Sequence, residues 1–366
     1  MVSHSLEVHD RKKVLNAIAF TLTIAFSAVS IPVKAQEIKY SERYLYAYKK
    51  YLNAECPVKN DSIQHFVYFA RDRELIENHP LLSNSMFKGA QIMYAWNEFE
   101  SEKGKYDFSI LKHDYEYLKR YGKKLFIQLQ DVTFNPQYSA LPDYLLTSEY
   151  DGGVAMQYND DGTPGGWVAK RWNKKVRERF ASLFKALGEE FNGKIEGINL
   201  QETSIGVNDS LFSYSDYING LKENMLALKM AFPTSTTMIY ANFTPGEWLP
   251  GNDKGYLRSI YEYGEKIGVG LGGPDLLITR KGQLNHILAL MHERQYTVPL
   301  GIAVQDGNYI GATGDVTEEE KETTHTNIVP VLHAFAKDFL KVTYMFWSNQ
   351  EPYFTKDVLP CFRNSN

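Results

Sequence analysis

The stretch "NKKVRERFASLFKALGEEFNGKIEGINLQE", residues 173–202, decides the fold of this 366-residue chain. Apolar residues recur at helical spacing over 173–193, which predicts an amphipathic helix. A short apolar strand follows at 195–202 and ends at a carboxylate, Glu202. Two interpretations of Glu202 are open: a functional side chain held at a strand tip, or simply the first solvated residue after a strand.

The same alternation of strand and helix runs along the rest of the chain. The strands are continuous apolar stretches, as expected for parallel strands buried on both faces. Pro330 is expected to kink the last helix. A long segment from 132 to about 166 is predicted as a loop. The predicted strands are 65–72, 87–96, 123–131, 195–202, 236–243, 269–278, 298–308 and 342–347, and the other predicted helices are 107–122, 214–232, 255–268, 282–295 and 319–340.

Eight such units in about this length predict a (β/α)8 barrel, the TIM-barrel fold, as a single domain over 65–366. A doubly wound sheet is the alternative. It requires a glycine-rich phosphate turn between an early strand and its helix. The glycine-rich run 270–273 does not open a helix at the right place, so the barrel is favoured.

Charge and composition limit the classes of partner. The net charge is −4, with acids and bases interspersed, and no basic stripe lies outside the first residues. A nucleic-acid partner is therefore not expected. Aromatic residues make up 14% of the chain, with 25 Tyr and 20 Phe. Most of these rings pack a core, but a surplus suits a surface that stacks on sugar rings.

The first 35 residues have the pattern of an export signal. Arg11 and the two lysines after it precede an uncharged apolar run over 14–31, and small residues then allow cleavage after Ala35. An uncleaved membrane anchor is the alternative, because the run is nearly long enough to span a bilayer. We expect a periplasmic or secreted protein with no membrane contact after cleavage. A polar lead-in segment, 36–64, follows the signal.

The chain has two cysteines, Cys56 and Cys361, near the two ends of the mature protein. Export permits a disulfide, and a closed barrel brings the chain ends together, so we expect the two to be bonded. Two buried free thiols are the alternative.

Polar and aromatic residues end nearly every predicted strand. Since the carboxyl ends of barrel strands meet at one mouth, these residues are expected to form a ring there. Acids and amides suit sugar hydroxyls and aromatic faces suit sugar rings, so an oligo- or polysaccharide is the expected substrate. The residues expected to contact it are Arg71, Trp96, Asp131, Gln201, Asn242, Asp275, Gln305, Tyr309 and Trp347.

The stretch "WNEFESEKGKYDFSIL" (96–111) resembles a motif that follows an early strand in (β/α)8 glycosidases of the large retaining clan, which includes β-galactosidases and β-1,4-glycanases. The next strand, "YGKKLFIQL" (121–129), is also similar to theirs. The resemblance implies an acid/base glutamate at the end of the fourth strand, which is Glu202 here. It also implies a tryptophan at the end of the eighth strand, which is Trp347.

The second carboxylate departs from the pattern of that clan. The resemblance implies a nucleophilic glutamate ending the seventh strand, but the sequence there has Asp306, and Gln201 stands where an asparagine is usual. Three interpretations are open: Asp306 is the nucleophile, it is the base of an inverting reaction, or the protein only binds sugar. Glu351, shortly after the eighth strand, is the alternative to Asp306.

No spacing of histidines, cysteines and acids indicates a metal site, and no cofactor is expected. The sequence has no G-x-S-x-G elbow, so a Ser-His-Asp hydrolase is not expected.

Overall fold

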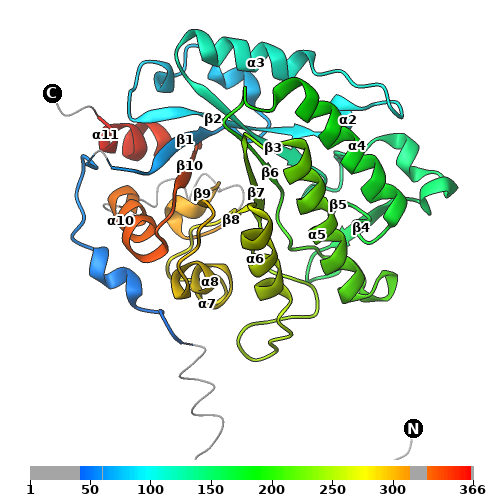
Figure 1. Cartoon of the computed structure of the whole chain (residues 1–366). Coiled ribbons are helices and arrows are strands. Elements are labelled where there is room, and N and C mark those ends of the chain that lie inside the picture. Colours follow the sequence, from blue (N-terminus) through cyan, green and yellow to red (C-terminus); the bar gives the residue numbers. More distant parts are fainter. Residues whose placement is uncertain (1–41, 60, 314–327, 364–366) are drawn as a thin grey trace, which may run out of the picture.

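The computed structural model describes residues 42–59, 61–313 and 328–363. Eight parallel strands form a closed barrel, and helices surround it (Figure 1). The predicted (β/α)8 fold is confirmed, and each strand lies within or beside its predicted range. The barrel strands are β1 (Gln64–Tyr68), β2 (Phe87–Ala95), β3 (Lys124–Gln130), β6 (Gly197–Leu200), β7 (Thr236–Tyr240), β8 (Gly270–Gly273), β9 (Leu300–Val304) and β10 (Tyr344–Ser348).

The strands pair in the order β1-β10-β9-β8-β7-β6-β3-β2, and β2 returns to β1. The first and last strands close the ring in parallel, with Gln64 opposite Tyr344 and Tyr68 opposite Ser348. A doubly wound sheet would leave two open edges, so the closure excludes that alternative.

The helices form the outer layer. Asn173 begins the helix over Lys174–Phe191, because its side chain accepts hydrogen bonds from the N–H groups of Lys175 and Val176. The helices are α2 (Trp96–Phe99), α3 (Ser109–Arg120), α4 (Lys174–Phe191), α5 (Tyr214–Ala231), α6 (Tyr256–Ile267), α7 (Lys281–Asn285), α8 (Ile287–Glu293), α10 (Ile328–Ala334) and α11 (Leu359–Cys361). Short 3-10 helices are η1 (Ala47–Tyr51), η2 (Arg73–Ile76), η3 (Pro80–Leu82), η4 (Asp143–Leu146), η5 (Ser148–Tyr150), η6 (Asp209–Leu211) and η7 (Asn308–Ile310), and π-helical turns are η8 (Phe335–Leu340) and η9 (Phe354–Val358).

Two of the predicted helices differ from the structure. The helix predicted over 282–295 is two helices, because His286 leaves the helical conformation (φ −99°, ψ −107°). Its ring Nε2 accepts a hydrogen bond from the N–H of Leu249, which ties the break to the loop after β7. The helix predicted over 319–340 is described only from Ile328, where α10 includes Pro330 and continues into η8.

The segment predicted as a loop over 132–166 contains a hairpin outside the barrel. Its antiparallel strands are β4 (Val154–Tyr158) and β5 (Pro164–Ala169). Asp161-Gly162 lies in the turn, and Gly162 has the positive φ (+81°) that such turns require. This Asp-Gly dipeptide between two apolar runs is the feature of the sequence that indicates a hairpin. The hairpin matters for the site because Tyr158 bonds to the main chain of Gly206, just after Glu202.

Aromatic rings fill the inside of the barrel. Phe126 packs against Phe66 and Phe346, with ring centroids 6.0 and 5.1 Å apart. Gly197 on β6 makes room for this layer, since a Cβ there would lie 2.5 Å from the ring of Phe126. Because side chains alternate along a strand, the neighbour of Phe346, Trp347, faces the helices outside. The filled interior leaves only the strand ends open for a site.

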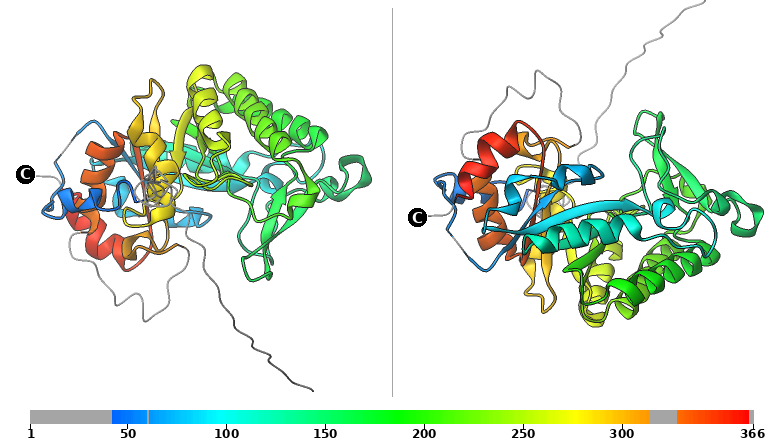
Figure 2. Two further views of the ribbon diagram at one scale, coloured as in Figure 1. Left: turned by 90° about the horizontal axis from the view of Figure 1, so that it is seen from below. Right: turned by 90° about the horizontal axis from the view of Figure 1, so that it is seen from above.

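The two ends of the described chain lie together. The segment before β1 runs beside α10 and α11 (Figures 1 and 2), and Tyr51 packs edge-on against Phe335. Cys56 and Cys361 form a disulfide with their Cα atoms 4.6 Å apart, so that prediction is confirmed. The predicted signal peptide, 1–35, lies outside the described residues. Among the described helices, none combines the length and apolar character needed to cross a membrane.

Cys361→Ser is expected to lower the free energy of unfolding by about 2–4 kcal/mol, because the disulfide restricts the unfolded chain. Urea unfolding measures this loss. Cys56→Ser and the double variant should lose the same amount, since all three lack the same bond. A double variant much less stable than either single variant would show that the thiols contribute separately, and would contradict this account.

Candidate active site

A pocket of about 780 Å³ lies at the carboxyl ends of the barrel strands. It combines two carboxylic acids, several amides and exposed aromatic rings. Pockets of this size and mixed lining are typical of small-molecule and carbohydrate sites. Its lining includes Phe134, Glu202, Asn242, Trp248, Asp275 and Gln305.

Glu202 follows β6 directly and lines this pocket. Burial, together with the negative charge of Asp275, raises the pKa of its carboxyl to about 7. A hydrogen bond from Asn242 and the charge of Arg171 oppose the shift without cancelling it. The carboxyl therefore carries a proton in a large fraction of molecules near neutral pH, which is the property of a general acid.

Asn242, predicted as a site residue, fixes the direction of that carboxyl. Its Oδ1 accepts from the N–H groups of Phe243 (2.9 Å) and Ser204 (3.2 Å). Its Nδ2 is thereby turned toward Glu202 and donates to Oε2 at 2.7 Å. One oxygen of the Glu202 carboxyl is held, and the other is left to act on a ligand.

Asp131, predicted to contact substrate, is buried against Arg171 and does not line the pocket. The guanidinium donates to both Asp131 oxygens, at 2.6 and 2.7 Å. Its remaining nitrogen donates to the main-chain oxygen of Glu202 (2.8 Å) and to the hydroxyl of Tyr217 (2.9 Å). That hydroxyl donates in turn to the main-chain oxygen of Thr203. The ion pair of Asp131 and Arg171 therefore fixes the main chain at Glu202 and Thr203.

Gln201 has a similar supporting role rather than the predicted contact with sugar. It is buried, and its Oε1 accepts from the N–H groups of Asp131 (3.1 Å) and Val132 (3.0 Å). The end of β3 is thus bonded to the residue that precedes Glu202. Sequence position identified both residues correctly as strand ends but did not reveal that they contact each other.

Asp275 lies in the turn after β8 and also lines the pocket. Asn308 donates from Nδ2 to its Oδ1 at 2.9 Å. Burial raises the pKa of Asp275, while the bond from Asn308 and the charge of Arg280 lower it by less. Gln305, predicted as a site residue, lines the same pocket.

Asp306 and Glu351, the two candidates for the second carboxylate, lie elsewhere. Asp306 lines a smaller pocket of about 150 Å³, together with Tyr68, and accepts a hydrogen bond from Ser348. Glu351 is exposed and accepts one from Thr355. Neither lines the pocket that contains Glu202.

Trp96, Tyr309 and Trp347, predicted to stack on sugar rings, are each fully buried and do not line the pocket. Trp96 packs on Phe180, and Tyr309 packs on Tyr353. Trp347 faces the helices because of the strand alternation described above. Arg71 is exposed, with its guanidinium 4.1 Å from the ring of Tyr138, and it does not line the pocket of Glu202.

The aromatic surface of the pocket comes from residues that the sequence analysis missed. Trp248, in the loop after β7, has 58% of its surface exposed and stacks on Phe243 at 5.5 Å. Phe134 has 60% exposed and lines the same pocket. A tryptophan in a polar, proline-containing loop after a strand was the available signal, since such a loop offers little core to bury it.

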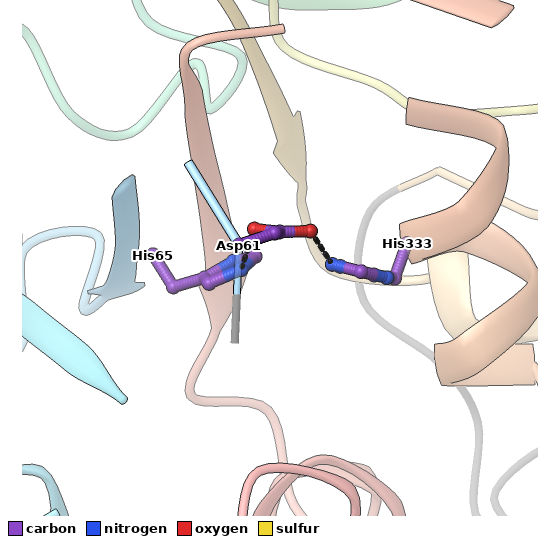
Figure 3. A group of neighbouring side chains, drawn as sticks. All are labelled: Asp61, His65 and His333. Atoms are coloured by element: carbon purple, nitrogen blue, oxygen red, sulfur yellow. Dashed lines mark ion pairs between the residues drawn. The ribbon is translucent and has the colours of Figure 1, made fainter. Parts of the chain in front are cut away.

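One group of metal-ligand type lies at the amino end of β1. Ligand atoms of Asp61, His65 and His333 lie within 4.8 Å of one another (Figure 3). Trp347 donates to Nδ1 of His65, so the neutral ring has its proton on Nε2, facing Asp61. Lys337 also lies 3.2 Å from Asp61. The proton on Nε2 of His65 and the ammonium group of Lys337 occupy the positions that a metal ion would need. We therefore interpret these residues as a buried polar network.

Several solved structures are similar in fold. Endo-glycoceramidase II from Rhodococcus sp. matches with a TM-score of 0.50 and 10% identity over 81% of this chain and 76% of that chain. GH10 from Paenibacillus barcinonensis gives 0.44 and 12% over 78% and 83%, and a β-galactosidase from Rahnella sp. R3 gives 0.47 and 10% over 80% and 51%. No family profile and no curated sequence matches the chain. At these identities the likeness establishes the (β/α)8 fold and no more.

Asp131→Asn is expected to destabilise the protein by about 3–5 kcal/mol, because Arg171 would stay buried without its counter-charge. Urea unfolding at pH 7 measures the loss. Glu149→Gln is the matched control: its ion pair with Lys103 is similarly short (2.7 Å) but exposed to solvent, and removing it should cost far less stability. Equal losses in the two variants would show that burial is not the cause.

Glu202→Gln is expected to stabilise the protein above neutral pH. The folded chain holds the proton of Glu202 up to about pH 7, whereas an ordinary glutamate has a pKa of 4.5. The stability from this proton is complete below the lower value and is lost as pH rises through the higher one. Unfolding at pH 8 should show a gain of up to about 3 kcal/mol, and unfolding at pH 5 a much smaller one. Equal effects at both pH values would contradict a raised pKa.

Proposed function

We propose that this protein hydrolyses O-glycosidic bonds in an oligo- or polysaccharide, with Glu202 as the general acid. The observation that carries the proposal is the Glu202 carboxyl: it has a pKa of about 7 and lies in a large pocket at the carboxyl end of the barrel. Exposed rings of Trp248 and Phe134 border the same pocket and suit the flat faces of sugars. Several proteins of similar fold have the names of glycosidases. Those names agree with the proposed reaction, but the proposal does not depend on them.

In the proposed reaction Glu202 gives its proton to the glycosidic oxygen as the bond to the anomeric carbon breaks. Asn242 keeps one carboxyl oxygen in place, so that the proton is presented in one direction. The resulting carboxylate then accepts a proton from water, which restores the starting state. A second carboxylate must balance the positive charge that develops on the sugar ring.

We also propose that the protein acts outside the cytoplasm. The charged start and apolar run of the first 35 residues are the pattern of an exported chain. The disulfide between Cys56 and Cys361 fits an oxidising compartment.

Sugar binding without hydrolysis is the second candidate function. It is favoured by one observation: Asp306, which stands where related barrels have a glutamate, lines a different pocket from Glu202. Screening the purified protein for reducing ends released from a panel of polysaccharides separates the two functions. Binding of a polysaccharide with no released ends would support the second candidate and contradict the first.

Glu202→Gln should slow hydrolysis of substrates with sugar leaving groups by about 10²–10⁴-fold, because the departing oxygen then lacks a proton donor. Aryl glycosides with strongly acidic leaving groups need little protonation and should be slowed much less. In the wild type, kcat/KM for sugar leaving groups should fall as pH rises above about 7, since the protonated form is the active one. An equal loss on both kinds of substrate would remove Glu202 from the acid role.

A further inference from the structure

We propose that Asp275, at the end of the sixth barrel strand, is the carboxylate that works with Glu202, in place of Asp306 or Glu351. This inference rests on the proposed glycosidase function. It concerns which carboxylate provides the negative charge that acts together with the general acid, Glu202.

The first argument is the shape of the site. Of the described residues that line the pocket of about 780 Å³, only Glu202 and Asp275 are carboxylic acids. Asp306 opens into the pocket of about 150 Å³ beside Tyr68, and its carboxylate accepts a hydrogen bond from Ser348. A sugar held against Trp248 would therefore share its pocket with Glu202 and Asp275.

The second argument is that the two acids are held in the same way. The Oδ1 atom of Asn308 accepts from the N–H groups of Leu276 (3.0 Å) and Gln305 (3.1 Å). Its Nδ2 is thereby turned toward Asp275, to which it donates. Asn242 holds Glu202 by a similar arrangement of two backbone donors and one side-chain donation, although Nδ2 of Asn308 also donates to the main-chain oxygen of Ala312.

Such matched supports fix each carboxyl in one orientation while leaving its second oxygen available. A residue that only packs against the pocket wall needs no such support. Preorganised carboxylates of this kind are what general acid–base and nucleophilic chemistry require.

The third argument is the charge of the two groups. Asp275 is near enough to Glu202 that its negative charge helps raise the pKa of that carboxyl. Burial raises the pKa of Asp275, while the bond from Asn308 and the positive charge of Arg280 oppose that shift. Two neighbouring carboxyls that influence each other's ionisation are the kind of pair that glycoside hydrolysis uses.

The reaction balances with these two groups and one water. Glu202 gives a proton to the glycosidic oxygen, and the pair of electrons in the C1–O bond stays on that oxygen. An oxygen of Asp275 either bonds to C1, to be displaced later by water, or removes a proton from the water that bonds to C1. In both cases the product is a free sugar, and the proton returns to the carboxyl pair.

The test compares Asp275→Ala with Asp306→Ala on the full-length protein, with dinitrophenyl glycosides and with the polysaccharide that the wild type cleaves. Asp275→Ala should lose at least about 10³-fold in kcat on both, because a better leaving group does not replace the missing anion. Added azide should restore activity on the dinitrophenyl glycoside, and the configuration of the glycosyl azide identifies the role of Asp275. Asp306→Ala should lose about tenfold or less.

A positioning role for Asp275 has a different signature. If the residue only raised the pKa of Glu202, Asp275→Asn would move the alkaline limb of the pH profile to lower pH and leave the dinitrophenyl substrate almost unaffected. That result would overturn the inference, as would a reversal of the two alanine variants. Unfolding midpoints of all variants, with Glu149→Gln as an exposed control, exclude loss of the fold as the cause.

Failure of the inference and failure of the proposed function are distinguishable. A wild type that releases no reducing ends from any polysaccharide defeats both. A wild type that hydrolyses, together with an active Asp275→Ala variant, defeats only the assignment of Asp275.

Discussion

The buried ion pair between Asp131 and Arg171 is the interaction on which the candidate site depends. It joins the end of β3 to the backbone of Glu202, and through Tyr217 it joins both to α5. A charged pair is expensive to bury unless it is well hydrogen-bonded, and here each of the three guanidinium nitrogens of Arg171 donates at least one hydrogen bond. As a result, the main chain at Glu202 is held rigidly although this residue belongs to a loop.

In this arrangement, the residues that hold the main chain at Glu202 are different from those that border the pocket. Asp131 and Arg171, which hold the main chain at Glu202, are buried, whereas the rings of Trp248 and Phe134, which border the pocket, are exposed. Loops of a barrel can therefore change while the acid keeps its position, which is the general reason why one barrel serves many substrates. In this chain Trp248 and Phe134 are exposed on such loops, whereas Asp131, Arg171 and Asn242 are buried.

The sequence predicts the barrel well because its strands are buried on both faces and its helices are amphipathic, and both patterns are local. Glu202 was predictable for the same reason, since it directly follows an apolar run. The direction of the Trp347 side chain could not be predicted from the sequence. It depends on which residues of β10 face the barrel interior, and pairing with distant strands determines that. Asp131 looked like a ligand-binding acid until its partner, 40 residues later, was known. Asp275 was predicted only as a sugar contact, because nothing near it in the sequence shows that Asn308 holds it.

The bond between Cys56 and Cys361 also makes most of the folded chain a covalent ring, since 305 positions separate the two residues. A protease that cuts one exposed loop within that ring, such as the hairpin turn at Asp161, would open the ring but release no fragment. The two pieces would remain attached and packed around the same core. A single cut of this kind would therefore leave the barrel in one covalent assembly.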